Sequence, residues 1–574
     1  MENRVMSDQA VSDEAVSDEA VFDAVVVGAG FAGMYMLHKL RSLGMSSVVI
    51  EAGTEVGGTW YWNRYPGARC DVPSMEYSYS FSDELQQEWE WSEAMSAQPE
   101  ILDYAKHVAD RFDLRRDIRF ETRVTAADFD EQSNTWVVTT DGGPSRQPET
   151  YRAQWCIMAT GCLSVPNVPD LPGLADFEGE LYHTGDWPKD EPALGGKRVG
   201  VVGTGSSGVQ AIPVLAERSG HLTVFQRSPV YTVPAKNRPM RPDVSEAFKR
   251  RYADIRERQR TSATGILGPT ALREPRPVVA SETPSAPRRP RPGILDLTPD
   301  ERIDAFDQQG PGAFMNFADV YRDPEANAVA CDLFRREIRK IVHDPAVAER
   351  LEPRDYPLAC KRQVIDTDYY ETFNRDNVTL VDLRRQPLLE VTAAGVRVGD
   401  GKSDDSEVEL DVLVLATGFD AMTGALERID IRGRGGVLLR DQWAGGPRTY
   451  LGLQIAGFPN LFTITGPGSP SVLSNVIVAI EQHVEWIAQC LRYLTENERS
   501  TIETTADAVE GWVAHVNEVA EGTMYVAPDC NSWYLGSNIE GKARVFMPYV
   551  GGLGRYRQRC DDVAANGYEG FVLA

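Results

Sequence analysis

The sequence predicts an α/β protein built from two Rossmann-like domains with a helical insertion. The first observation behind this prediction is a pattern of apolar strand, glycine-rich turn, helix and second strand near the start of the chain. The second is a repeat of that pattern near residue 200, and the third is a long Arg- and Pro-rich segment that follows it. Strands that alternate with helices are typical of parallel sheets covered by helices. At 574 residues, the chain is expected to hold about three or four folding units.

Composition narrows the class of protein further. Hydrophobic residues at 42% and charged residues at 25% are typical of a globular chain and exclude a fibrous or wholly disordered one. The formal net charge of −26 repels a phosphate backbone, so we expect no nucleic-acid partner. The longest apolar run, residues 24–37, is broken by glycines and is shorter than the roughly 20 residues of a membrane span. Because acidic residues and no basic signal precede it, we expect a cytoplasmic protein that has no membrane partner.

The first glycine-rich turn lies between a strand and a helix, and a second strand follows. The predicted bounds of these three elements are 22–27, 33–43 and 47–50. The turn carries Gly28, Gly30 and Gly33, and Glu51 follows the second strand. Such glycines let a helix N-terminus approach a pyrophosphate, and the carboxylate accepts hydrogen bonds from ribose hydroxyls. The pattern predicts an acidic dinucleotide site that suits FAD, after a disordered acidic tail at residues 1–20.

The second glycine-rich turn has the same setting but a different charge. Its strand, helix and following strand are predicted over 198–202, 208–218 and 222–225. The turn and helix start comprise Gly203, Thr204, Gly205, Ser206, Ser207, Gly208 and Val209. Where the first unit has a carboxylate, this one has Arg227 and Ser228. A guanidinium and a hydroxyl suit a 2′-phosphate, which predicts NADPH as the second cofactor.

The remaining chain supplies further strands and the insertion. Strands at 155–158 and 411–415 each end in Ala-Thr-Gly, a backbone exit that suits the neighbourhood of a bound dinucleotide. Six prolines between 275 and 292 indicate an exposed loop within the insertion. We therefore expect an FAD-binding domain (21–165 and 385–550), an NADPH-binding domain (166–235 and 335–384), a helical, Pro-rich insertion (236–334) and a C-terminal tail (551–574).

Longer motifs separate two classes of flavoprotein. Eight cysteines without a C-x-x-C pair argue against electron transfer to a disulfide and against a metal site. Between the two turns, the pattern F-x-G-x-x-x-H-x-x-x-W-P begins at Phe177. With G-G-T-W at 57–60 and R-C-D at 69–71, it resembles the type I Baeyer-Villiger monooxygenases, a flavoprotein monooxygenase family. The resemblance covers about residues 22–549.

The resemblance implies which residues perform the chemistry. In such enzymes the segment matching Lys361 and Arg362 supplies a cation near the NADP phosphate, followed by the catalytic arginine. The aspartate matching Asp71 orients that arginine. A guanidinium there would lower the pKa of a C4a-peroxyflavin, and it would then stabilise the ketone's carbonyl oxygen, which becomes negative when the peroxide attacks the carbonyl carbon. The resemblance also implies a further set of positions in contact with the cofactors: Thr59, Trp60, Tyr61, Trp62, Arg69, Cys70, Tyr77, Val124, Val476 and Trp533.

These residues predict an enzyme that uses O₂ to convert a ketone into an ester or lactone. In its excess of Arg over Lys and its long Arg/Pro insertion, the chain resembles members of the family that act on cyclic terpenoid or steroid ketones, among them the pentalenolactone D synthases of antibiotic biosynthesis. Two alternatives remain open: a flavin monooxygenase that oxidises nitrogen or sulfur, and an NADPH-binding redox protein without oxygen transfer. His183 and Trp187 of the linking motif are interpreted either as a packed linker pair or as a coupling between the domains.

Overall fold

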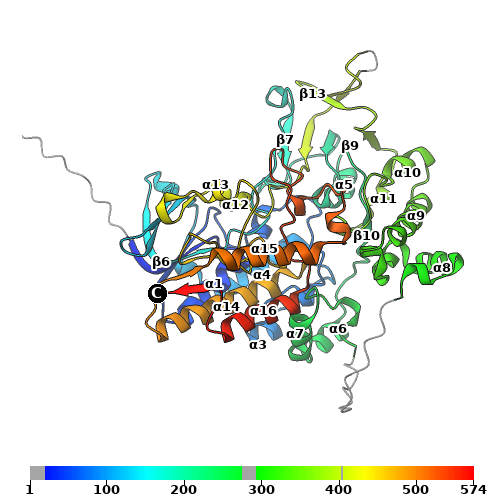
Figure 1. The fold of residues 1–574 in the computed structure, drawn as a ribbon. Coiled ribbons are helices and arrows are strands. Elements are labelled where there is room, and N and C mark those ends of the chain that lie inside the picture. Colours follow the sequence, from blue (N-terminus) through cyan, green and yellow to red (C-terminus); the bar gives the residue numbers. More distant parts are fainter. Residues whose placement is uncertain (1–19, 274–291, 403–404) are drawn as a thin grey trace, which may run out of the picture.

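The computed structural model describes residues 20–273, 292–402 and 405–574, and two sheets organise it (Figure 1). The larger sheet has eight strands in the order β17-β4-β5-β6-β1-β2-β3, with β18 pairing with β6. Its strands are β17 (Asp430–Arg432), β4 (Val124–Asp130), β5 (Thr135–Thr140), β6 (Thr150–Met158), β1 (Ala20–Val27), β2 (Ser47–Ile50), β3 (Ile118–Arg119) and β18 (Leu461–Thr463). The expected tail and Pro-rich loop fall mostly outside the described residues.

The first Rossmann-like unit forms as the sequence predicts. β1 is flanked by β2 on one side and by β6 on the other, and both pairings are parallel. Between β1 and β2 runs α1 (Phe31–Ser42), whose buried face packs against α14 (Val476–Glu496). The second half of β1 (24–27) and all of β2 are buried at every position, as expected of parallel strands covered by helices on both faces.

The second sheet has five strands, all parallel, in the order β12-β9-β8-β16-β7. They are β12 (Val378–Asp382), β9 (His221–Gln226), β8 (Arg198–Val202), β16 (Val412–Leu415) and β7 (Glu180–His183). α5 (Ser206–Arg218) connects β8 to β9. The two sheets confirm the predicted α/β class.

We expected the chain to return to the first sheet at residue 385, but it returns later. β16 belongs to the second sheet, and the antiparallel unit that precedes it projects at the top of Figure 1. This unit comprises β13 (Leu388–Thr392), β14 (Gly395–Val398) and β15 (Ser406–Glu409). Its apolar side chains share a core with β9 and β16, so the segment is built onto the second unit.

The insertion is mostly helical and divides between the two cores. α6 (Pro242–Lys249) and α7 (Tyr252–Thr261) pack on the first core through Phe248, Tyr252 and Ile255. α8 (Pro299–Gln309) and α9 (Pro324–Ile341) pack on the second core through Phe306 and Phe334. Helices α8, α9, α10 (Pro345–Leu351) and α11 (Tyr369–Thr372) gather at the right of Figure 1, while α6 and α7 lie below them. The remaining helices and strands include α2 (Thr59–Trp62), α3 (Asp83–Glu88), α4 (Gln98–Arg111), α12 (Gly424–Glu427), α13 (Leu439–Gln442), α15 (Ala506–Ala520), β10 (Thr232–Pro234), β11 (Val364–Asp366) and β19 (Ile502–Thr504).

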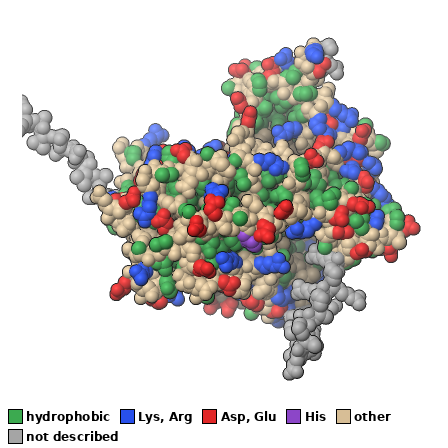
Figure 2. Space-filling view, viewed as in Figure 1, with side chains coloured by type: hydrophobic (Ala, Val, Ile, Leu, Met, Phe, Trp, Pro, Cys, Tyr) green, Lys and Arg blue, Asp and Glu red, His purple; other side chains and the backbone are tan. Residues whose placement is uncertain are grey.

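The C-terminal segment is folded, although we expected a tail there. α16 (Leu553–Ala565) packs against α7 and α14, and β20 (Phe571–Leu573) pairs with β19. The buried Tyr556 and Val563 explain this, because they recur on one face of α16. No helix in the described parts of the chain is long and apolar enough to cross a membrane. Figure 2 shows acidic and basic side chains interspersed over one face of the molecule.

Candidate active site

The first glycine-rich turn joins β1 to α1 in a backbone shape that requires glycine. Gly28 has φ +102°, and a Cβ atom there would lie 2.7 Å from the carbonyl oxygen of Ala159 at the end of β6. A Cβ atom on Gly33 would lie 1.8 Å from the Gly28 carbonyl oxygen, so the helix packs directly on the turn. Gly30 caps α1 without a side-chain hydrogen bond. The start of the helix therefore presents backbone N–H groups, as a pyrophosphate of FAD requires.

Glu51 stands beside this turn at the end of β2. Its side chain is buried, and its two oxygens accept hydrogen bonds from the backbone N–H groups of Ala29 and Gly53, each at 2.7 Å. Burial raises the pKa of the carboxyl, and the two N–H groups oppose that shift. Each oxygen retains a lone pair for a ribose hydroxyl. The residues present fit an FAD adenosine, and Glu51 also holds the turn itself.

The second turn repeats this geometry at the start of α5. Gly203 has φ +108°, and a Cβ atom would lie 2.5 Å from the carbonyl oxygen of Ala416, at the exit of β16. Gly205 caps α5 without a side-chain bond, and it and Ser206 are exposed. The Thr204 hydroxyl donates to the carbonyl of Ser228 at 2.8 Å, which joins the turn to the end of β9. The other predicted residues of this turn, Ser207, Gly208 and Val209, are buried in the first turns of α5.

Two cations converge next to this second turn. Arg227 is exposed just after β9, and no residue in the described ranges forms a hydrogen bond or ion pair with its guanidinium. The Lys361 ammonium lies 4.0 Å from the ring centroid of Tyr356. Burial lowers the pKa of Lys361, and repulsion from Arg227 lowers it further. A doubly charged phosphate placed between them would relieve that repulsion, so the pair fits the 2′-phosphate of NADPH.

Arg362 and Asp71 form an ion pair between the two units. The Nε and Nη2 atoms of Arg362 donate to Oδ2 of Asp71 at 2.9 and 2.7 Å. The exposed fractions of the two side chains are 28% and 27%, so both remain partly open to solvent. Although burial opposes it, Asp71 raises the pKa of the guanidinium above its ordinary value. The structure therefore joins the two residues that the resemblance implies as the catalytic pair.

Further groups fix the orientation of Arg362. Its Nη1 donates to the carbonyl oxygen of Val472, and its guanidinium lies close to the hydroxyl of Tyr534. Tyr534 is fully buried, and that burial raises its pKa. Tyr534 was not among the predicted site residues, although it directly follows the predicted Trp533. The signal that could have identified it was its place beside a predicted site residue.

Several other predicted residues surround the first turn and the ion pair. The Trp60 indole donates to the Tyr77 hydroxyl at 3.1 Å, and both side chains are buried. α2, which comprises Thr59, Trp60, Tyr61 and Trp62, begins directly after Gly58, whose Cα lies 3.4 Å from a Cβ built on Gly30. Cys70 is buried, and burial together with the Asp71 charge raises its pKa. All eight cysteines fall within the described residues and carry free thiols.

Other predicted residues have contacts outside the first turn and the Arg362–Asp71 ion pair. The guanidinium of Arg69 pairs with Glu93 and with the carbonyl of Met95. Val124 is packed in a core cluster at the start of β4, and Val476 is the partly buried first residue of α14. Trp533 lies beside Tyr534, with ring centroids 4.4 Å apart and ring planes tilted by 58°.

The linking motif packs the end of β7 against the exit of β16. His183 Nδ1 accepts the N–H of Gly185 at 2.9 Å, and Nε2 lies 3.2 Å from the Thr417 hydroxyl. Burial lowers the pKa of His183, which favours the neutral ring. Trp187 is buried against Tyr182, with ring centroids 5.2 Å apart. These contacts pack the linking motif against the second sheet.

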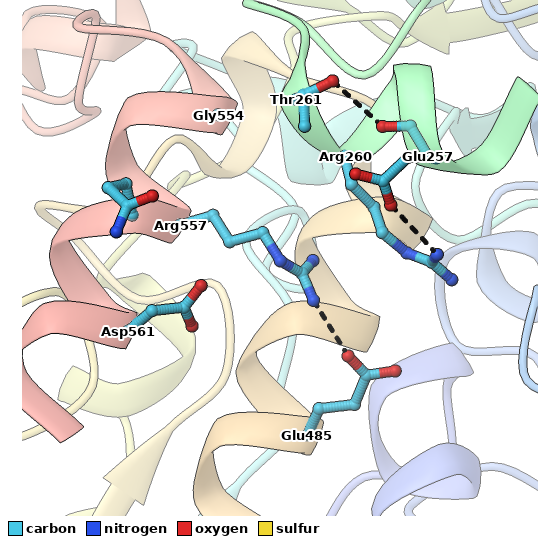
Figure 3. Close-up of a pocket in the computed structure, with 8 residues that line it drawn as sticks. Glu257, Arg260, Thr261, Glu485, Gly554, Arg557 and Asp561 are labelled. Carbon is cyan, nitrogen blue, oxygen red and sulfur yellow. Dashed lines mark hydrogen bonds and ion pairs between the residues drawn. The ribbon is translucent and has the colours of Figure 1, made fainter. Parts of the chain in front are cut away.

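A separate cleft of about 440 Å³ lies between α7, α14 and α16 (Figure 3). Arg557 reaches into it and pairs with Glu485 at 3.1 Å, while Arg260 and Glu257 line the opposite wall. None of the residues that line this cleft belongs to the predicted site. No group of His, Cys, Asp and Glu that could hold a metal ion occurs among the residues the structure describes.

Comparisons with known proteins agree with this geometry. A family model described as pyridine nucleotide-disulphide oxidoreductase matches residues 25–266. A Baeyer-Villiger monooxygenase of Pseudooceanicola batsensis is 41% identical over 95% of this chain and 95% of its own length. The phenazine N-monooxygenase PhzNO1 of Lysobacter antibioticus is also 41% identical, over 95% and 96%.

Solved structures show the same likeness. A steroid monooxygenase bound to NADP is 46% identical with a TM-score of 0.86, covering 96% of this chain and 99% of its own. A complex of OTEMO with FAD and NADP is 39% identical with a TM-score of 0.87, covering 97% and 100%.

Two glycine turns, one acidic and one basic, with an arginine-aspartate pair between them define an FAD- and NADPH-dependent flavoprotein monooxygenase. Full-length identity of about 40% then places the chain more narrowly. It belongs to the Baeyer-Villiger monooxygenase family.

Proposed function

We propose that this enzyme inserts one oxygen atom of O₂ beside the carbonyl of a cyclic, terpenoid or steroid-like ketone and releases a lactone or ester. The observation that carries the proposal is the ion pair between Arg362 and Asp71, which is partly open to solvent. A fixed cation is the group that this reaction needs, because negative charge develops on the carbonyl oxygen when the ketone is attacked.

The side chains around Arg362 have distinct roles in this proposal. Bound FAD, once reduced by NADPH, supplies the oxygen-activating chemistry. Arg362 stabilises negative charge on the reacting oxygens, and its raised pKa keeps it protonated throughout. Asp71 holds two of its nitrogens in one orientation, while Tyr534 and the Val472 carbonyl hold the remaining side of the guanidinium. Because all of these partners are fixed before substrate arrives, little reorganisation is needed during the reaction.

In this proposal, each glycine turn binds a different cofactor. Gly28, Gly33 and Glu51 hold the adenosine end of FAD on the first sheet. The start of α5 takes the pyrophosphate of NADPH, and Arg227 with Lys361 takes its 2′-phosphate. The mutual repulsion between those two cations supports the second assignment, since an anion between them is stabilised by both.

The proposal also includes the class of substrate. The 46% identity to a steroid monooxygenase favours a bulky cyclic ketone, and proximity to the pentalenolactone D synthases stays a prediction. A second candidate is oxidation of an aromatic nitrogen, because a phenazine N-monooxygenase is 41% identical over nearly the full length. Both reactions use the same cofactors, so the cofactor sites do not separate them.

A substrate panel tests the two candidates directly. We would follow NADPH consumption with cyclohexanone, a bicyclic terpenoid ketone, a 20-keto steroid and phenazine, and identify products by mass and NMR. A lactone or ester from a cyclic ketone supports the proposal. An N-oxide from phenazine, without oxygenation of any ketone, would replace it with the second candidate.

A further inference from the structure

Gln210 of α5 links the second unit to the loop that carries Asp71. Its Oε1 atom accepts hydrogen bonds from the Tyr65 hydroxyl at 2.8 Å and from the backbone N–H of Arg69 at 3.3 Å. Its Nε2 atom donates to the carbonyl oxygen of Arg69 at 3.0 Å. The oxygen and the nitrogen of the Gln210 amide therefore both form hydrogen bonds to the same short loop.

The backbone of this loop also lies directly against α5. Gly67 has φ +80°, and a Cβ atom there would lie 2.2 Å from the carbonyl oxygen of Gln210 and 3.1 Å from the side chain of Val214. On its other side, the N–H of Cys70 donates to the carbonyl of Ser96 at 3.1 Å. The loop is thus held between α5 and the first unit.

The position of Gln210 in the chain gives these contacts a functional consequence. It follows directly on Val209, the last residue of the turn and helix start assigned to NADPH, and Arg69 is two residues before Asp71. Arg362, the partner of Asp71, precedes β11, whose side chains pack in the second core. The alignment of Asp71 with Arg362 therefore depends on how the first unit's loop is held relative to the second unit.

We propose that Gln210 is a positioning residue that fixes the Asp71 loop against α5 and so couples occupancy of the NADPH site to the alignment of Arg362. This inference rests on the proposed function, which assigns α5 to NADPH and Arg362 to oxygen transfer. Gln210 itself touches neither reacting group; it acts through the Arg69 backbone and Asp71.

The test compares Gln210→Ala with Val214→Ala, which removes packing on the same contact but no hydrogen bond. Flavin content and unfolding temperature report on folding, and titration with NADP⁺, followed by the flavin absorbance, reports on binding without turnover. We expect Gln210→Ala to retain flavin and to weaken NADP⁺ binding by up to roughly tenfold, because the substitution removes all three hydrogen bonds that dock the loop on α5, the arrangement to which NADP⁺ binds best. Hydrogen peroxide released per NADPH should rise several-fold, with the KM for the ketone unchanged. Val214→Ala should show neither effect.

An Asp71→Asn background separates positioning from general packing. If Gln210 acts through Asp71, adding Gln210→Ala to Asp71→Asn should cause no further rise in peroxide release. Full additivity of the two substitutions, or equal effects of Val214→Ala and Gln210→Ala, would overturn the proposal. A wild-type enzyme that oxygenates no ketone would refute the proposed function instead, while the NADP⁺ titrations would still report on Gln210.

Discussion

Replacement of Arg362 by alanine removes the cation between the two units. The guanidinium makes hydrogen bonds to Asp71 and to the carbonyl of Val472 and lies close to Tyr534, so the substitution leaves a partly exposed carboxylate without its partner. Because Asp71 is 27% exposed, water takes over part of that pairing, and we expect a stability loss of only about 1 to 2 kcal/mol. The fold and the FAD site on the first sheet should survive.

The cost to the reaction should be much larger than the cost to stability. Removing one preorganised group that stabilises a developing negative charge lowers kcat by about 10²- to 10³-fold, or roughly 3 to 4 kcal/mol. Hydride transfer from NADPH requires no such charge, so anaerobic bleaching of the flavin should persist at a slower rate. We therefore expect Arg362→Ala to consume NADPH and O₂, to release hydrogen peroxide and to form almost no ester.

Stopped-flow absorbance measures the reductive step, and product yield per NADPH measures oxygen insertion. Arg362→Lys is the matched control, because it keeps the charge but loses the two-nitrogen contact with Asp71. It should recover part of the product yield. An ester yield from Arg362→Ala near that of the wild type would refute the role given to Arg362, and with it the orienting role of Asp71.

Three further substitutions test other parts of the molecule. Arg227→Ala should shift preference from NADPH towards NADH by about 10- to 100-fold, or roughly 1 to 3 kcal/mol, and steady-state kinetics with both cofactors would show an unchanged ratio if the assignment is wrong. Glu51→Arg places a bulky cation in the first turn and should yield protein without flavin; a full flavin-to-protein ratio would contradict the FAD assignment. Burial lowers the pKa of His483 to about 3, and its ring bonds to Thr465 and Tyr556 in the folded state. Because the unfolded chain takes up this proton below about pH 6.5 and the folded protein does not until about pH 3, the free energy of unfolding should fall with decreasing pH in that window, by about 2 kcal/mol at pH 5. Urea titrations at pH 7 and 5 should show a smaller decrease for His483→Gln, and an equal decrease would contradict the buried neutral ring.

The strands and helices next to the glycine turns could be predicted because their signals are local. β2 and β8 begin and end where the apolar runs predict, and α1 begins two residues before the expected residue 33. The sheet to which β16 belongs could not be predicted from local signals. An apolar strand carries no information about which sheet edge it joins, and only packing against β8 and β7 decides that.

The motifs of the candidate site could be predicted from the sequence, but the residues that hold the site residues in place could not. Asp71 and Arg362 came from a resemblance, and nothing in their spacing of nearly 300 residues predicts a contact at 2.7 Å. Tyr534 and Gln210 are uncharged polar residues on helices, as many other residues of the chain are. No signal in the sequence therefore predicts that they lie at the site. Their roles follow only from what they touch, namely the guanidinium of Arg362 and the backbone of Arg69.

The division of the ion pair between two units has a consequence for how this enzyme loses function. Asp71 is held on the first unit by the loop around Cys70, and Arg362 is held on the second unit beside Lys361. A substitution at the junction that displaces one unit by even 1 Å leaves both cofactor turns intact, yet it lengthens the hydrogen bonds between these two side chains. Such a variant would bind FAD, oxidise NADPH and release peroxide. Loss of oxygen insertion with retained cofactor binding is therefore the expected signature of damage at the junction, whereas damage within either glycine turn removes the cofactor itself.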